Sequence, residues 1–102
     1  MKDELIDELI YDSSIVKHAD SDGTVYGIRI LGRGENLFFC RNDIGLICQF
    51  DAIHSTVFAN TIKVWSDGKK IPVKEREILL TKMKEYYQLV YQRELLVLPR
   101  FS

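Results

Sequence analysis

The chain has 102 residues, of which 46% are apolar and 28% charged, and its formal net charge is −1. This length accommodates a single domain, residues 1–102, with one modest core. The sequence lacks both the positively charged start of a secretory signal and the run of about 20 apolar residues that a membrane-spanning helix needs. We therefore expect a cytoplasmic protein.

The first twelve residues contain the same four letters twice, at positions 3–6 and 7–10. The apolar residues of the repeat recur at i and i+4, with acidic residues between them, and this spacing is typical of a short amphipathic helix. Helices of this length are marginal in isolation. We therefore predict that its apolar side, formed by Leu5, Ile6, Leu9 and Ile10, docks on the domain and that its acidic side faces outward.

Charge is distributed unevenly along the chain. Residues 1–22 carry seven acids and two bases, whereas residues 23–102 have a net charge of +4. An acidic segment disfavours nucleic acid, because phosphate contacts come from Lys and Arg, and it suits a basic protein partner. The alternative is that these acids are a solvated surface that only keeps a small domain in solution. The predicted partner-binding residues are Asp3, Glu4, Asp7, Glu8, Asp12, Asp20 and Asp22.

Residues 14–65 predict a meander of β-hairpins. Turn signals rich in Gly, Asn and Asp occur at 21–23, 32–34, 42–45 and 66–68, and they separate runs of β-branched and aromatic residues. The last of these runs extends from Thr56 to Trp65. Because Trp65 ends a strand just before a helix, we expect it to fill the corner between sheet and helix.

A long helix is predicted over residues 73–92, because Leu79, Met83, Tyr86 and Val90 recur at helical spacing and define an inward face. Leu80 and Tyr87 widen this face, and the opposite face is polar. A final strand follows at 94–98. The predicted fold class is α+β: an antiparallel sheet of about five strands packed against one long C-terminal helix, with a last strand after that helix and a short acidic helix at the N-terminus.

Residues that carry chemistry are few. Cys40 and Cys48 lie in apolar runs, which favours buried free thiols. With two histidines and no Cys-x-x-Cys or phosphate-binding loop, the sequence predicts no metal site, no cofactor and no catalytic set. A nucleophilic pair of His54 with either thiol would require spatial adjacency and an orienting group. We prefer to interpret these residues, and His18, as ordinary parts of hairpins.

Several stretches between about 24 and 98 carry a family resemblance: VYGIRI, GLICQFDAI, TIKVWSDGKKIPVKEREILLTKM and ELLVL. Hairpins, a strand ending in Trp, a polar turn, a long helix and a last apolar strand follow one another in this order. The chain thus resembles small immunity proteins of bacterial polymorphic-toxin and contact-dependent inhibition systems. This resemblance implies a cytoplasmic, non-enzymatic protein that binds and neutralises one cognate toxin domain, such as a nuclease.

Two hypotheses about function follow from the sequence. The first is an inhibitory binding protein, which needs no catalytic residues. The second is a small enzyme or accessory regulator with a site that leaves no motif. A deep pocket converging on His18, His54 or the cysteines would favour the enzyme, and a flat or convex acidic patch would favour the inhibitor.

Overall fold

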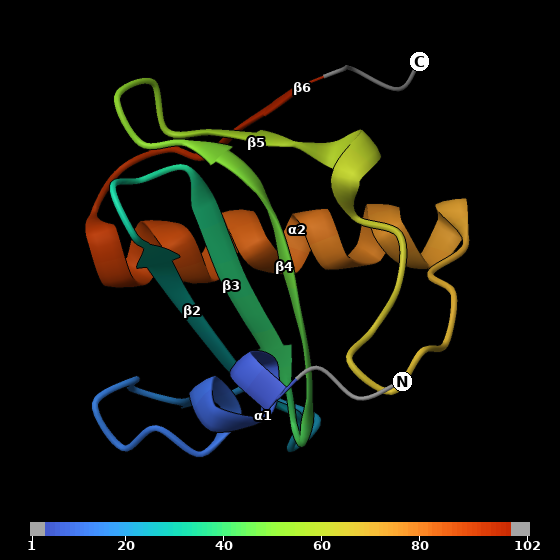
Figure 1. The fold of residues 1–102 in the computed structure, drawn as a ribbon. Helices are drawn as coiled ribbons and strands as arrows, with labels where there is room; N and C mark the ends of the chain where they lie inside the picture. The colour runs from blue at the N-terminus through green and yellow to red at the C-terminus, as the bar shows by residue number, and fades with distance from the viewer. Residues whose placement is uncertain (1–3, 99–102) are drawn as a thin grey trace.

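A computed structural model describes residues 4–98 and has the predicted α+β architecture (Figure 1). The helices are α1 (Glu4–Ile10) and α2 (Val73–Tyr91), and a 3-10 turn covers Ala59–Thr61. The strands are β1 (His18–Ala19), β2 (Val25–Leu31), β3 (Asn36–Arg41), β4 (Ile44–Asp51), β5 (Thr56–Phe58) and β6 (Leu96–Leu98).

The six strands lie in the sheet in the order of the sequence, from β1 to β6. Neighbours from β1 to β5 are antiparallel, as predicted, whereas β6 pairs with β5 in parallel. The turn between β3 and β4 has two residues, Asn42 and Asp43, and Asn42 has a φ of 54°. Asn tolerates this left-handed conformation better than most residues, so the turn is tight and fixes the register of the hairpin.

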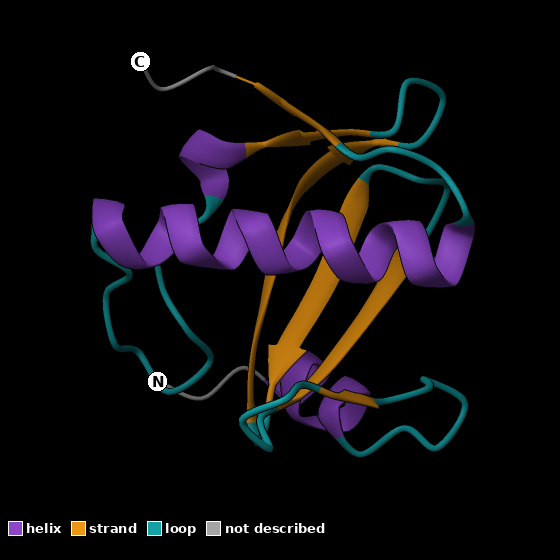
Figure 2. Ribbon diagram, turned by 180° about the vertical axis from the view of Figure 1, so that it is seen from behind, coloured by secondary structure: helices purple, strands orange, loops and turns teal. Residues whose placement is uncertain are grey.

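The sheet is covered on both faces, by α2 on one side and α1 on the other (Figure 2). Side chains of β3 alternate between these layers: Leu37 and Phe39 belong to the core under α2, and Phe38 and Cys40 to the core under α1. Each of these four side chains is fully buried. Because successive side chains of a strand point to opposite faces, a strand that is buried on both faces requires consecutive apolar residues.

Helix α2 packs largely as its spacing predicts. Leu79, Met83 and Tyr86 are buried, together with Leu80 and Tyr87. The inward placement of Val90 was wrong, since this residue is 38% exposed. In the same last turn of α2, Tyr91 contacts the sheet instead, because its hydroxyl accepts the N–H of Ile30 in β2 at 2.9 Å.

Helix α1 docks through Ile6 and Ile10, which are 6% and 3% exposed, and Leu9 packs at the margin of this contact. The expectation that Leu5 shares the docked side was wrong, because it is 53% exposed. Each residue turns the helix by about 100°, so Leu5 lies well outside the stripe of Ile6 and Ile10.

Two strand predictions also differ from the structure. The run from Thr56 to Trp65 is strand only over β5, because the 3-10 turn follows at once and the Thr61 hydroxyl donates to the Phe58 carbonyl at 2.6 Å. The last strand begins at Leu96, not at 94, and its parallel pairing makes the sheet mixed. The sheet is mostly antiparallel, as predicted, and β6 is the parallel exception because the connection from β5 to β6 passes through the whole of α2.

Candidate functional site

The acidic residues of α1 face away from the sheet. Glu4 and Glu8 are exposed and Asp7 is partly buried, while Ile6 and Ile10 hold the opposite side of the helix against β3 and β4. The Lys17 ammonium donates to the carbonyl of Ile10 at 2.6 Å and so satisfies one acceptor at the end of the helix. Asp3, the remaining predicted acid of this segment, lies outside the described residues.

Gly45, the second residue of β4, allows α1 to approach the sheet closely. A Cβ atom at this position would lie 3.0 Å from Cγ2 of Ile6 and 3.0 Å from Cε1 of Phe38. Both distances are shorter than ordinary van der Waals contacts. The absence of a side chain at position 45 therefore sets how near the acidic helix lies to the β3–β4 turn.

Beside α1 the surface is hollowed, with a volume of about 510 Å³. Acidic residues from three separate elements line this space: Asp7 from α1, Asp43 from the β3–β4 turn and Asp67 from the turn after Trp65. We call it the acidic hollow. Its lining residues are Asp7, Tyr11, Asp43, Ile44, Ser66, Asp67 and Lys69.

Backbone hydrogen bonds fix the walls of the acidic hollow. Ser66 N–H donates to the Gly45 carbonyl at 2.8 Å, and Gly45 N–H donates back to the Ser66 hydroxyl at 3.1 Å. The Asp67 carboxylate accepts the N–H of Lys69 at 3.0 Å, an arrangement typical of Asx turns. The turn that carries Asp67 is thereby attached to the strand that begins beside Asp43.

Trp65 anchors the same turn from beneath. It is 3% exposed, and its indole N–H donates to the Glu75 carboxylate of α2 at 3.1 Å. Arg41, at the end of β3, lies 4.7 Å from the centre of the indole ring and also contacts Glu75 at 3.1 Å. The prediction that Trp65 fills the corner between sheet and helix is confirmed, and the corner supports one wall of the acidic hollow.

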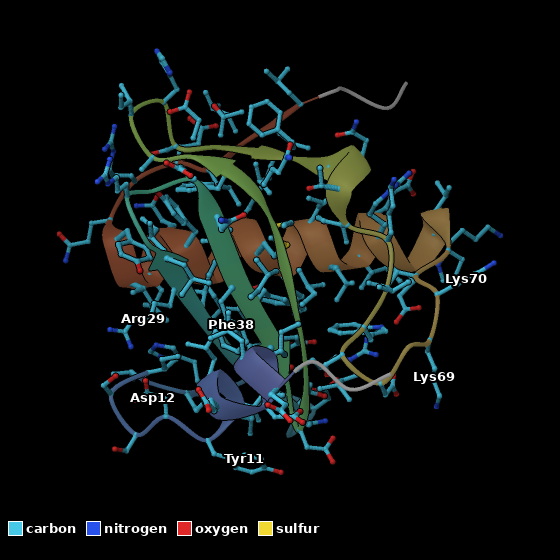
Figure 3. The ribbon with its side chains drawn as sticks, in the orientation of Figure 1. Tyr11, Asp12, Arg29, Phe38, Lys69 and Lys70 are labelled. Atoms are coloured by element: carbon cyan, nitrogen blue, oxygen red, sulfur yellow. The ribbon has the colours of Figure 1, made fainter. Side chains whose placement is uncertain are left out.

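Chemically, the acidic hollow is suited to a cationic side chain. It presents three carboxylates and one ammonium, that of Lys69 on the 66–70 loop (Figure 3). Tyr11 is 78% exposed and points away from the sheet, so its ring is free to pack on a partner. A carboxylate can accept charge-assisted hydrogen bonds from Arg or Lys, and an exposed aromatic ring can stack on a guanidinium.

The other predicted acids do not join this surface. Asp12 accepts from the backbone and hydroxyl of Ser14 and pairs with Arg29 at 3.4 Å (Figure 3), and the Ser14 hydrogen bonds chiefly lower its pKa. Asp20 pairs with Lys82 of α2 at 2.5 Å, and this bond lowers the pKa of its carboxyl. The pKa of Asp22 is also lowered, first by the N–H of Thr24.

The thiols and histidines lie apart from one another. Cys40 and Cys48 are unbridged and buried as predicted, but in the separate cores on opposite faces of the sheet. Burial raises the pKa of Cys48 to about 12 and that of Cys40 in the same direction. His54 lies on the exposed turn before β5, 2.8 Å from Asp51, and His18 stacks on Tyr86. Across residues 4–98, no group of three His, Cys, Asp or Glu side chains has a geometry that could hold a metal ion.

Comparisons with protein-family models, with curated proteins and with solved structures found no match to this chain. Within the described part of the chain, neither helix has the length and hydropathy needed to cross a membrane. The acidic hollow itself was missed at the sequence level. Asp43 and Asp67 are turn residues in the sequence, and no linear signal indicates that their turns meet beside Asp7.

Proposed function

We propose that this chain is an inhibitory binding protein that neutralises a cognate bacterial toxin domain by direct contact, and that it uses the acidic surface around α1. The observation that carries this proposal is the acidic hollow. Acidic residues from three elements far apart in the sequence line one concave space, and the same helix α1 carries the exposed Glu4 and Glu8. The resemblance of residues 24–98 to immunity proteins gives the same class of function.

The chemistry of the surface indicates which region of a toxin it contacts. A nuclease domain binds phosphate through a groove rich in Lys and Arg. An inhibitor that places carboxylates against such a groove gains speed of encounter and selectivity for its partner, because opposite potentials steer association. The acidic hollow would take one basic side chain of the groove, and the acids of α1 would face its neighbours.

The experiment begins with the polypeptide encoded immediately upstream, since a toxin and its inhibitor are expected to be neighbours. Growth arrest by that polypeptide, and relief by coexpression of this chain, is the expected result. The variant Asp7→Asn/Asp43→Asn/Asp67→Asn removes three charges and keeps the oxygen that each side chain offers as an acceptor. It should slow association with the purified toxin domain by about tenfold or more at low salt and by much less at high salt.

A matched control removes the same number of charges elsewhere. Glu77, Glu85 and Glu94 lie on α2 or just after it, away from the acidic hollow. Their combined replacement by Gln should leave the association rate nearly unchanged. If the two triple variants slow association equally, the net charge of the chain sets the association rate and the acidic hollow has no specific role. No binding by the wild-type chain would reject the proposed partner.

A further inference from the structure

Between the 3-10 turn and α2, residues 62–72 form a loop at one end of the molecule (Figure 1). The two arms of this loop run antiparallel, because Val64 and Lys70 form a β-bridge. Next to this bridge, the N–H of Ile71 donates to the Lys63 carbonyl at 2.8 Å. Lys63 and Lys70, on opposite arms, therefore occupy neighbouring positions in space.

Positive charge is concentrated on this loop and on the first turn of α2. Residues 63–76 carry five bases and two acids, a net charge of +3. Four of these bases are exposed lysines, and in the part of the chain from 4 to 98 none of the four has an ion-pair partner within 4.0 Å. We call these lysines the basic loop: Lys63, Lys69, Lys70 and Lys74.

The two acids of this region do not neutralise the basic loop. Glu75 pairs with Arg41 at 3.1 Å and also accepts the indole N–H of Trp65. The Asp67 carboxylate accepts the backbone N–H of Lys69 and belongs to the lining of the acidic hollow. Exposed lysines without acidic partners give the surface a local positive potential. This potential lies next to the negative potential of α1 and the acidic hollow.

The basic loop and the acidic hollow share one stretch of chain. Asp67 and Lys69 line the hollow, and Lys70, the next residue, points outward from the loop (Figure 3). The Ser66–Gly45 hydrogen bonds attach this stretch to β4. A stable interface covers about 800 Å² of each partner, which is more than one basic side chain in the hollow can cover. A domain seated over the hollow therefore also meets the basic loop.

We propose that the contact surface is bipolar, with α1 and the acidic hollow as its negative half and the basic loop as its positive half. This inference rests on the proposed function. The cognate toxin domain then carries a basic groove for the hollow and, beside that groove, acidic side chains for the basic loop. Val64 and Val73, which are 50% and 55% exposed, lie among the lysines and add apolar contact area. A protein that is basic over its whole surface would be repelled by the loop, so the two halves together select the partner.

The direction of one charge effect tests this inference. The variant Lys63→Gln/Lys70→Gln/Lys74→Gln changes the formal net charge of the chain from −1 to −4, because three bases are lost. If net charge alone steered association, this variant would bind a basic toxin domain faster than the wild type does. The bipolar surface predicts the opposite. Association with the purified toxin domain encoded immediately upstream should be about threefold slower at low salt and less affected at high salt.

A matched control has the same net charge of −4, because it also loses three bases. The variant Arg33→Gln/Lys84→Gln/Arg93→Gln removes exposed bases from the β2–β3 turn, from the second half of α2 and from just after it, at the other end of the molecule from the basic loop (Figure 1). It should associate at the wild-type rate or faster. A lysine variant that is no slower than this control overturns the inference, and the proposed function stands if the acidic-hollow variant is still slow. A wild-type chain that does not bind rejects both.

Zero-length cross-linking locates the two halves of the contact. A carbodiimide joins a lysine amine to a carboxylate that touches it, as in an ion pair. In the complex, Lys63, Lys70 or Lys74 should become joined to Asp or Glu of the toxin domain, and Glu4 or Glu8 to its lysines, as identified by mass spectrometry. Cross-links from the acids of α1 alone would confine the contact to the negative half and overturn the inference.

Discussion

The two faces of the sheet are covered very differently. On one face α2 spans 19 residues and buries five side chains in a core that extends from Tyr26 to Leu95. On the other face α1 spans seven residues and buries two, in a core that is completed by Ile15, Phe38 and Cys40. Because burial of apolar area supplies most of the stability, the face under α2 holds the fold together. The face under α1 is the thinner layer, and it carries the acidic residues proposed to bind a partner.

The strongest test of this difference places a charge in the larger core. Met83 is fully buried under α2. Met83→Asp would put an unpaired carboxylate among apolar side chains and should lower the free energy of unfolding by more than about 4 kcal/mol. Thermal unfolding measures this loss. The exposed Gln88→Asp is the control and should change stability by less than about 1 kcal/mol. An unchanged melting temperature for Met83→Asp would show that α2 is misplaced.

The two thiols report on the two faces separately. Burial raises the pKa of Cys48, under α2, to about 12, so little thiolate forms in the folded protein at neutral pH. Labelling of Cys48 should therefore require global unfolding, whereas opening of α1 alone should expose Cys40. We expect Cys40 to react at least about tenfold faster, measured with single-Cys variants by mass spectrometry. Equal rates in native buffer would mean that both layers open together.

A smaller effect is expected from closing the gap under α1. Gly45→Ala would place a methyl group against Ile6 and Phe38 and should cost about 1–3 kcal/mol by overpacking. Ile6→Ala removes the clashing Cγ2 atom, so the double variant should be less destabilised than the sum of the two single ones. Urea unfolding of the four proteins completes this cycle. Strict additivity would indicate that α1 does not contact β4 at Gly45.

The smallest effect concerns a polar contact between the N-terminal segment and α2. The hydrogen bond from Lys82 chiefly lowers the pKa of Asp20, so the unfolded chain takes up this proton at higher pH than the folded one. The stabilisation is present above the ordinary Asp pKa of about 3.9 and is lost as pH falls through the lower, folded value. The stability of Asp20→Asn should therefore fall less steeply than that of the wild type as the pH is lowered below about 4. A pH series of melting temperatures for both proteins provides the measurement.

The order of elements was predictable because turn residues and periodicity are local signals. The tight turn at Asn42, the polar face of α2 and the buried thiols all followed from neighbouring residues. The errors have different causes. Leu5 and the run from Thr56 to Trp65 depended on local geometry, namely the rotation of about 100° per residue in α1 and the 3-10 turn after β5. Val90 depended on tertiary packing, because it has the spacing of the buried face of α2 but is exposed, and the parallel direction of β6 depends on the crossover through α2.

The candidate site was predictable only in its α1 half. The repeated acids of residues 3–8 indicate an outward charged face without knowledge of the fold. Asp43 and Asp67 line the same hollow as Asp7 because of tertiary structure. The β3–β4 register, the Ser66–Gly45 hydrogen bonds and the buried Trp65 place their two turns there. Asp12 and Asp20 were predicted to bind a partner but form ion pairs within the protein. Their partners, Arg29 and Lys82, are distant in sequence, so the sequence alone does not indicate these pairs.

The parallel pairing of β5 with β6 also has a consequence for how the molecule folds. Thr56 pairs with Leu96, 40 positions later, and the whole of α2 lies between them. The hairpins from β2 to β5 join near neighbours and can form early, whereas β6 must wait until a long loop closes, which is entropically slower. We expect the first collapsed species to contain the four hairpin strands with α2 laid across them. Until β6 arrives, the edge of β5 is open, and intermolecular pairing at that edge is the main misfolding hazard of the chain.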